Sequence, residues 1–402
     1  MNILSCSTVN ECTSCQMCAA ICSHDAITIN LNLDGFYRPN IDENKCVDCG
    51  LCTKVCYKFD EKIDLTSPER IRNIGVYSAQ SKSDDLLKDV TSGGVADSLA
   101  KVLVQQGFVC IGVTYNIERH RAEHIAVFTE DGTKSFRGSK YIQSYSIDAF
   151  KELVKNVRTT KFAVFGLPCH IYAINKYLTL RKIRDKCILI DLFCHGCPSM
   201  HVWTKYREVI RKKIGNKKID KVNFRSKAKG WGAFNISVLS DKTQLFVSTP
   251  MNDEFYSLFF SDLVLNDACS NCALRSTVEY TDVRLGDFWG KRFVRDRKGV
   301  SAVAISSERG NSIFKAIKNN FRTEQHSMEE VIKKQSYGII YHTNLSMRKI
   351  MMEALRDESK SLTEITKFYY SKQGILPKLK RVIKLIDWYL PFDITRFFKR
   401  FA

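Results

Sequence analysis

The stretch from Cys12 to Cys56 constrains the chain more than any other part of its sequence. The pattern C-x2-C-x2-C-x3-C occurs in it twice, first as Cys12, Cys15, Cys18 and Cys22 and then as Cys46, Cys49, Cys52 and Cys56. Cysteines three apart lie on one side of a tight loop, so three thiolates can face one metal centre. The fourth cysteine follows a further turn and points the other way. Each run therefore predicts three ligands for one centre and one ligand for its neighbour.

This spacing is the ligand pattern of bacterial ferredoxins with two 4Fe-4S clusters, in which the fourth cysteine of each run serves the other cluster. It predicts one cluster on Cys12, Cys15, Cys18 and Cys56, and a second on Cys46, Cys49, Cys52 and Cys22. Ser23 and Tyr57 stand where a proline usually follows the fourth cysteine. C-x2-C pairs also build four-cysteine zinc sites, but such sites do not need a repeated triplet with an offset fourth ligand.

Composition restricts the class of protein. The chain has 402 residues, 44% of them hydrophobic, which is enough for two or three domains. Thiolate ligands require a reducing compartment, the N-terminus shows no signal peptide, and no apolar run approaches the ~20 residues that span a bilayer. We therefore expect a cytoplasmic protein. The formal charge of +19 suggests an anionic partner. No nucleic-acid-binding module accompanies it, so we expect no nucleic acid.

The order of patterns predicts a mixed α/β (α+β) protein. Residues 1–60 form a small two-cluster ferredoxin domain, and 61–75 form a linker. A larger α/β domain follows, with residues 76–160 as its N-terminal part and 161–355 as its C-terminal part. Residues 356–402 form a helical, basic, amphipathic tail.

Two stretches of the larger domain could bind phosphate. Thr91-Ser92-Gly93-Gly94 precedes a helix that ends at Gly107, and Thr91 or Ser92 can cap it. Exposed amides at that helix end would suit a phosphate, although a simple loop and cap fits the same residues. The basic stretch from Arg137 to Ser144 could grip phosphate or form a solvated turn.

Two apolar runs each lead to a cysteine. Residues 162–165 and 188–193 read as buried strands, followed by Cys169-His170 and by Cys194-His195. Ligands bind at the carboxyl edge of open α/β sheets. Two thiols could meet there, and Cys269 and Cys272 offer another pair, so the four could hold a third 4Fe-4S cluster. Buried cysteines beside an unrelated zinc-type pair remain the alternative. Gly286-Asp287-Phe288-Trp289-Gly290 could line a ring-binding cleft or form a packed turn.

The tail is basic. From Leu376 to Ala402 it has seven basic and two acidic residues, with Leu379, Val382, Ile383, Ile386 and Leu390 on one helical face. Such a helix can lie on an anionic membrane at the inner face, as a peripheral contact. Docking on the protein's own core or on a partner fits the same pattern.

Taken together and in this order, the motifs resemble those of the coenzyme F-420 hydrogenase/dehydrogenase beta-subunit family, in the version with an N-terminal two-cluster ferredoxin. The resemblance covers about residues 10 to 355. It implies an iron-sulfur flavoprotein in which FAD contacts Ser92, Gly93, Gly94, Gly138, Ser139, Lys140 and Tyr141. It also implies a third 4Fe-4S cluster on Cys169, Cys194, Cys269 and Cys272, whereas Cys6, Cys110, Cys187 and Cys197 fall outside the pattern.

The resemblance implies an oxidoreductase that passes electrons between 4Fe-4S clusters and FAD, with a small-molecule substrate and an electron donor or acceptor that is a protein or a reduced coenzyme. Many similar bacterial proteins lie near surface-polysaccharide genes. His195 and His170 are candidate proton carriers, although a histidine beside a ligand often serves only to hydrogen-bond it. Two alternatives stay open: an electron-transfer subunit without a substrate site that docks on a partner oxidoreductase, and a zinc interaction module.

Overall fold

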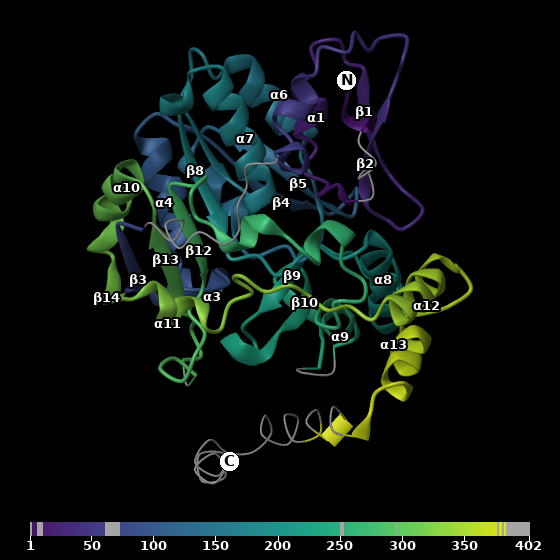
Figure 1. Cartoon of the computed structure of the whole chain (residues 1–402). Coiled ribbons are helices and arrows are strands. Elements are labelled where there is room, and N and C mark those ends of the chain that lie inside the picture. Colours follow the sequence, from purple (N-terminus) through teal and green to yellow (C-terminus); the bar gives the residue numbers. More distant parts are fainter. Residues whose placement is uncertain are drawn as a thin grey trace.

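The computed structural model describes residues 2–5, 11–60, 73–249, 253–294, 296–375, 378–379 and 382. A large mixed sheet forms the centre, the cysteine-rich N-terminal module lies beside it, and α12 (Leu345–Arg356) and α13 (Leu362–Ser371) extend from the body (Figure 1). Cys6, residues 61–72 of the expected linker 61–75 and most of the basic tail beyond α13 lie outside the described residues, and β3 already begins at Gly75. Within the described part, no helix has the length and apolar character that crossing a bilayer requires.

The central sheet has nine strands. In spatial order they are β14 (Phe321–His326), β3 (Gly75–Ser81), β13 (Ser301–Ile305), β12 (Val283–Asp287), β8 (Cys187–Leu192), β7 (Phe162–Phe165), β4 (Val109–Asn116), β5 (Arg121–Val127) and β6 (Ser144–Tyr145). The neighbours β12, β8, β7 and β4 are parallel to one another. Their carboxyl ends therefore share one edge of the sheet, as the two apolar runs predicted.

Helices cover both faces of this sheet because its central strands are apolar on both sides. On one face, α6 (Ile147–Asn156) and α7 (Pro168–Leu180) pack against Val164 and Leu189. On the other, α4 (Val95–Gln105) and α10 (Glu308–Lys318) pack against Ala163 and Ile188. Neighbouring strand residues thus serve opposite layers, as the two-residue period of a strand requires.

A second lobe carries its own core. The antiparallel strands β9 (Lys221–Ser226), β10 (Asn235–Ser240) and β11 (Thr243–Val247) pack with α8 (Met200–Ile214), α9 (Glu254–Phe259), α12 and α13. The short helices α3 (Asp84–Asp89), α5 (Glu130–Thr133) and α11 (Met328–Ile332) lie outside this core. No motif in the sequence indicated this separate sheet, which is a new finding.

The N-terminal module is small and closely attached. It consists of the strands β1 (Ile27–Leu31) and β2 (Tyr37–Ile41) with the helices α1 (Met17–Ala20) and α2 (Leu51–Lys54). Met17, Ala20 and Ile21, on and just after α1, join the core of α6 and α7. The module and the large domain therefore share one hydrophobic layer.

The predicted strands are present, and one predicted helix cap needs correction. Strand β7 matches residues 162–165, and β8 covers most of 188–193. Helix α10 begins at Glu308, because Ser307 accepts a hydrogen bond from the amide of Gly310 and caps it. Neither Thr91 nor Ser92 caps α4, whose N-cap is Gly94 at φ 93° without a side-chain bond.

Candidate functional site

The first cysteine group forms on tight loops of the N-terminal module. Gln16, between Cys15 and Cys18, has a left-handed backbone at φ 64°. Burial and the neighbouring thiols of Cys15, Cys12, Cys56 and Cys52 together raise the pKa of the Cys18 thiol. The structure thus gathers Cys12, Cys15, Cys18 and Cys56, the set that the sequence predicted for one cluster.

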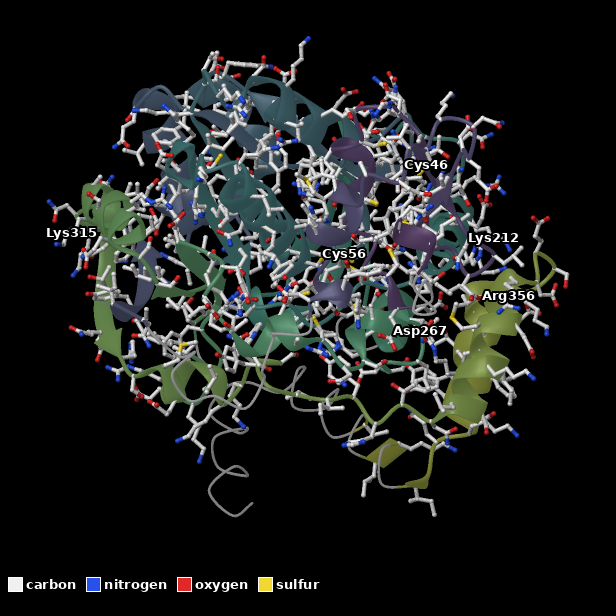
Figure 2. All side chains as sticks on the ribbon, turned by 45° about the horizontal axis from the view of Figure 1, so that its top comes forward. Cys46, Cys56, Lys212, Asp267, Lys315 and Arg356 are labelled. Carbon is white, nitrogen blue, oxygen red and sulfur yellow. The ribbon has the colours of Figure 1, made fainter. Side chains whose placement is uncertain are left out.

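The second cysteine group lines a small cavity nearer the surface. Cys22, Cys46, Cys49 and Cys52 all contribute to its wall. Cys49 is exposed, and Gly50 beside it takes a left-handed backbone at φ 71°. Figure 2 shows Cys46 nearer the edge of the molecule than Cys56. The pair of sites therefore runs from the surface toward the interior.

The third cysteine group lies at the carboxyl edge of the central sheet. Cys169 is the second residue of α7, directly after β7, and Cys194 follows β8. Burial raises the pKa of Cys194, and the thiols of Cys269 and Cys272 add to this effect. The thiols of Cys169, Cys194, Cys269 and Cys272 thus lie near one another at this edge.

Cys169 also lies next to the first group. Burial raises the pKa of its thiol, and Cys15 is the first of the neighbouring thiols that add to the effect, before Cys197, Cys194 and Cys272. The third group and the first group are therefore adjacent in space, although the sequence separates them widely.

Cys197 is the residue that sequence reasoning missed. Its thiol lies with those of Cys269, Cys194 and Cys272, which raise its pKa in addition to burial. Its backbone amide also donates a hydrogen bond to the Cys269 thiol. A bridge between Pro198 and Leu265 holds the two chain segments together. The only sequence signal was its position three residues after Cys194.

Arginine side chains surround the third group. Arg275 is buried, donates to the carbonyl of His195, and acts to lower the pKa of the Cys194 and Cys269 thiols against the effect of burial. Arg284 is buried in an ion pair with Asp191 at 2.5 Å and acts on the pKa of Cys194 in the same direction. A thiolate-ligated cluster carries negative charge, so these cations suit one.

The two candidate proton carriers differ in their surroundings. His170 is 3% exposed, its ring packs on His124 and Phe150, and burial lowers its pKa to about 4. It is enclosed in the core and turned away from solvent. His195 instead lies 2.9 Å from Asp262 through Nε2 and 2.9 Å from the Tyr341 hydroxyl through Nδ1.

Asp262 and Tyr341 connect His195 with the surface of the protein. Both line a cavity between the segment 340–344 and the end of α13, with Met347 and Tyr369 among the other wall residues. His195 is therefore connected to solvent through polar side chains, whereas His170 is not.

The two stretches with predicted phosphate contacts meet each other. The amide of Ser139 donates to Thr91 Oγ1 at 2.8 Å. Ser92 Oγ donates to the carbonyl of Val300, and Gly93 N donates to Ser301 Oγ. Gly138, at φ 81°, has open space where a side chain would stand. The turn and the loop thus face one another.

The basic groups of the second stretch already have protein partners. Arg137 pairs with Asp97 at 2.7 Å and with Asp89 at 2.9 Å. Lys140 Nζ donates to the carbonyls of Ser135, Phe136 and Arg137, and its burial lowers its pKa to about 7. The loop is therefore shaped by these cations, which are engaged with the protein itself.

An aromatic and charged wall lies beside this loop. Arg225 donates to the Tyr141 hydroxyl at 2.9 Å and to Asp287 at 3.0 Å, and its guanidinium lies 3.7 Å from the ring centre of Phe234. Trp289 stacks on Trp231 with ring centres 4.8 Å apart. The glycine-flanked segment 286–290 thus supplies both a carboxylate and a flat ring to this wall.

No three Cys, His, Asp or Glu side chains in the described ranges converge as ligands of a single metal ion would. The thiols of each cysteine group lie close enough to raise one another's pKa without converging in that way. Burial is the chief cause that raises the pKa of the Cys15 thiol to about 11 and that of the Cys56 thiol to about 12. These thiols would lose their protons on binding iron, as coordinated thiols do.

Comparison with known proteins shows what two parts of the chain are similar to. Residues 159–331 match a family model that describes the C terminus of the beta subunit of coenzyme F420 hydrogenase/dehydrogenase. This part of the chain is similar to that beta-subunit family. Residues 11–58 match the model of a 4Fe-4S dicluster domain. The beta-subunit region thus holds all five cysteines of the third group, and the dicluster domain holds the other two groups.

Two individual proteins match most of the length of this chain. An uncharacterised protein of Methanocaldococcus jannaschii is 24% identical over 360 residues, which cover 81% of this chain and 92% of the relative. A chain of the F420-reducing [NiFe] hydrogenase complex from Methanosarcina barkeri matches with 20% identity and a TM-score of 0.45, covering 77% of this chain and 96% of that one. The chain is an iron-sulfur electron-transfer protein related to a hydrogenase/dehydrogenase beta subunit.

Proposed function

We propose that the chain is an FAD-dependent iron-sulfur oxidoreductase that acts on a small molecule. The observation that carries this proposal is the position of Cys169, which lies beside Cys15 of the dicluster domain and beside the cysteines of the third group. A third centre there would stand between the dicluster domain and the carboxyl edge of the large sheet. An edge of this kind is where open α/β sheets bind ligands.

The residues have distinct tasks in this proposal. Two clusters are held by the dicluster cysteines, and the third by Cys169, Cys194, Cys269 and Cys272. When bound, such clusters pass electrons singly, and a flavin converts single electrons into pairs. Arg275 and Arg284 offset the negative charge of the ligating thiolates of the third group.

FAD would lie against the loop that Thr91 and Ser139 close. Ser92, Gly93, Gly94, Gly138, Ser139 and Tyr141 are on or beside that loop, while Lys140 holds its shape. Arg225 and Trp289 stand on its other side, so a flat ring and an anionic group both find partners there. Gly138 lets a ligand approach the backbone closely.

His195 is the better of the two proton carriers. It lies between Asp262 and Tyr341, which line the surface cavity, and directly follows a cysteine of the third group. His170 stays in the core. A proton could therefore be exchanged with solvent at His195 without opening the fold.

The alternative is an electron-transfer subunit that has no substrate site and docks on a partner oxidoreductase. The net charge of +19 favours it, because a positive surface attracts an acidic partner. This alternative needs the dicluster domain but not FAD.

Anaerobic reconstitution with iron, sulfide and FAD separates these functions. The proposal predicts about twelve irons, about twelve sulfides and about one FAD per chain. Flavin absent from a protein that holds its iron would favour the electron-transfer subunit. Zinc without acid-labile sulfide would overturn every cluster assignment.

A further inference from the structure

Tyr57 belongs to one cysteine group by sequence and to another by packing. It directly follows Cys56, at the position where ferredoxins usually have a proline. Its side chain is 8% exposed and packs with Tyr172, Ala273 and Leu274, together with Cys169 and Cys272. The ring therefore fills the space between the first and the third cysteine groups.

The orientation of the Tyr57 ring is fixed by its neighbours. The ring meets Tyr172 edge to face, with centres 6.0 Å apart, and the Lys58 ammonium lies 4.9 Å from its centre. The hydroxyl of Tyr172 is occupied, since it donates to Asp60. The two adjacent tyrosines therefore differ in the hydrogen bonding of their hydroxyl groups.

The Tyr57 hydroxyl is buried and has no hydrogen-bond partner among the described residues. Leaving a buried hydroxyl unpaired costs about 1–3 kcal/mol, so such a group usually has a function or a ligand. Burial raises its pKa, and the charges of Cys272, Cys169, Cys269 and Cys56 add to the effect in that order. Two of these cysteines, Cys169 and Cys272, also pack in the same cluster as the Tyr57 ring, and both belong to the third group.

We propose that Tyr57 is a positioning residue for electron transfer, whose hydroxyl donates a hydrogen bond to a sulfur of the third cluster. The inference rests on the proposed function, because it needs that cluster. Hydrogen bonds to cluster sulfurs are one of the means by which proteins set reduction potentials. A donor stabilises the more negative, reduced state, so Tyr57 raises the potential of the third cluster and draws electrons inward from the dicluster domain.

The test is a redox titration followed by electron paramagnetic resonance on the reconstituted full chain. The signal of the third cluster is identified as the one missing from Cys194→Ser. In Tyr57→Phe, the midpoint potential of this signal should shift to a more negative value while the iron content is unchanged. Tyr172→Phe is the matched control, since it removes a neighbouring hydroxyl that is bonded to Asp60, and it should leave the potential where it was.

The possible failures are distinguishable. An unchanged potential in Tyr57→Phe at full iron content would overturn the role of Tyr57 and leave the proposed function intact. A shift confined to the dicluster signals would also overturn it, because the hydroxyl would then serve the first cluster. Wild-type protein with only about eight irons would overturn the proposed function, and this inference with it.

Discussion

At the scale of single residues, five cysteines are available for the four ligand positions of the proposed third centre. Cys169, Cys194, Cys269 and Cys272 are the proposed ligands, and the thiol of Cys197 lies among them. Because Cys197 donates its amide to Cys269, we assign it to supporting that ligand. The distinction can be tested by metal content.

Cys169→Ser should lose about a third of the iron, which is one cluster of three, because serine does not replace a thiolate ligand well. Iron and acid-labile sulfide per chain are the measurements. Cys197→Ser should retain nearly all of the iron, and Cys110→Ser, a buried cysteine outside the three groups, is the control. If Cys197→Ser loses the iron and Cys169→Ser keeps it, the ligand set must be reassigned.

Sequence spacing could predict the dicluster domain because all eight of its cysteines lie within one local pattern. It could also bring Cys169 and Cys194 together, since both follow parallel strands. It could not find Cys197 or Tyr57. Their positions depend on long-range contacts, such as the bridge between Pro198 and Leu265, for which a motif carries no signal.

At the scale of elements, the turn before α4 is held tightly against the sheet. A Cβ on Gly93 would lie 2.0 Å from the carbonyl oxygen of Ala79 in β3 and 2.7 Å from the amide nitrogen of Ser301 in β13. Neither backbone atom can move without disturbing the pairing of β3 with β13. Glycine is therefore required here for space, whereas at Gly94 the left-handed backbone requires it.

Gly93→Ala should lower the free energy of unfolding by about 1–3 kcal/mol or more, since overpacking against backbone forces the sheet to shift. Thermal unfolding measures this loss. The FAD content of the reconstituted protein shows whether the loop that Thr91 and Ser139 close has kept its shape. Gly232→Ala is a suitable control, because a Cβ there meets no atom within 4 Å. Equal stability of the two variants would contradict the close approach.

Two buried histidines make the layer of β5 and α7 sensitive to acid. Burial lowers the pKa of His124 well below 6.5 and that of His170 to about 4. The fold therefore favours their neutral forms, and protonation favours the unfolded chain. Their contribution to stability is complete above pH 6.5 and declines as the pH falls from there toward about 4.

His124→Gln should flatten the dependence of the melting temperature on pH between about 6.5 and 4. The exposed His342 provides the matched control, because His342→Gln should keep the wild-type slope. All variants share any loss of clusters in acid. The difference between their slopes of melting temperature against pH therefore reports on the histidine alone. An unchanged slope in His124→Gln would show that this ring does not contribute.

The sequence could predict elements with strong periodicity and could not predict their arrangement. Strands β7 and β8 were evident as apolar runs, and their layering follows from that character. The second lobe was not evident, since β10 and β11 are antiparallel strands of mixed polarity whose partners lie on α8 and α13. Packing partners distant in the chain decide such elements.

At the scale of the whole molecule, buried polar contacts attach the dicluster domain. Asn266 is 0% exposed, and its amide group donates to the carbonyl of Cys12 and to Ser14 Oγ. Its oxygen accepts from Arg38. On another side of the module, Gln16 donates to the carbonyl of Ser144 and accepts from the amide of Ser146.

Asn266→Leu should cost about 3 kcal/mol, because it leaves several buried groups without partners. Hydrogen exchange should then speed up in β1 and β2 more than in the central sheet, since the attachment of the module is what weakens. Asn319→Leu, at an exposed position on the end of α10, should change neither. Uniform protection in Asn266→Leu would show that the module is held by other contacts.

The attachment of the dicluster domain has a kinetic consequence. A module joined to the large domain by Asn266 and Gln16 has no docking step of its own, so transfer within the molecule should be first order and insensitive to salt. Delivery by an acidic donor protein is bimolecular, and a chain of charge +19 should accept electrons more slowly as ionic strength rises. Stopped-flow reduction at several salt concentrations should therefore show one phase that slows with salt and one that does not.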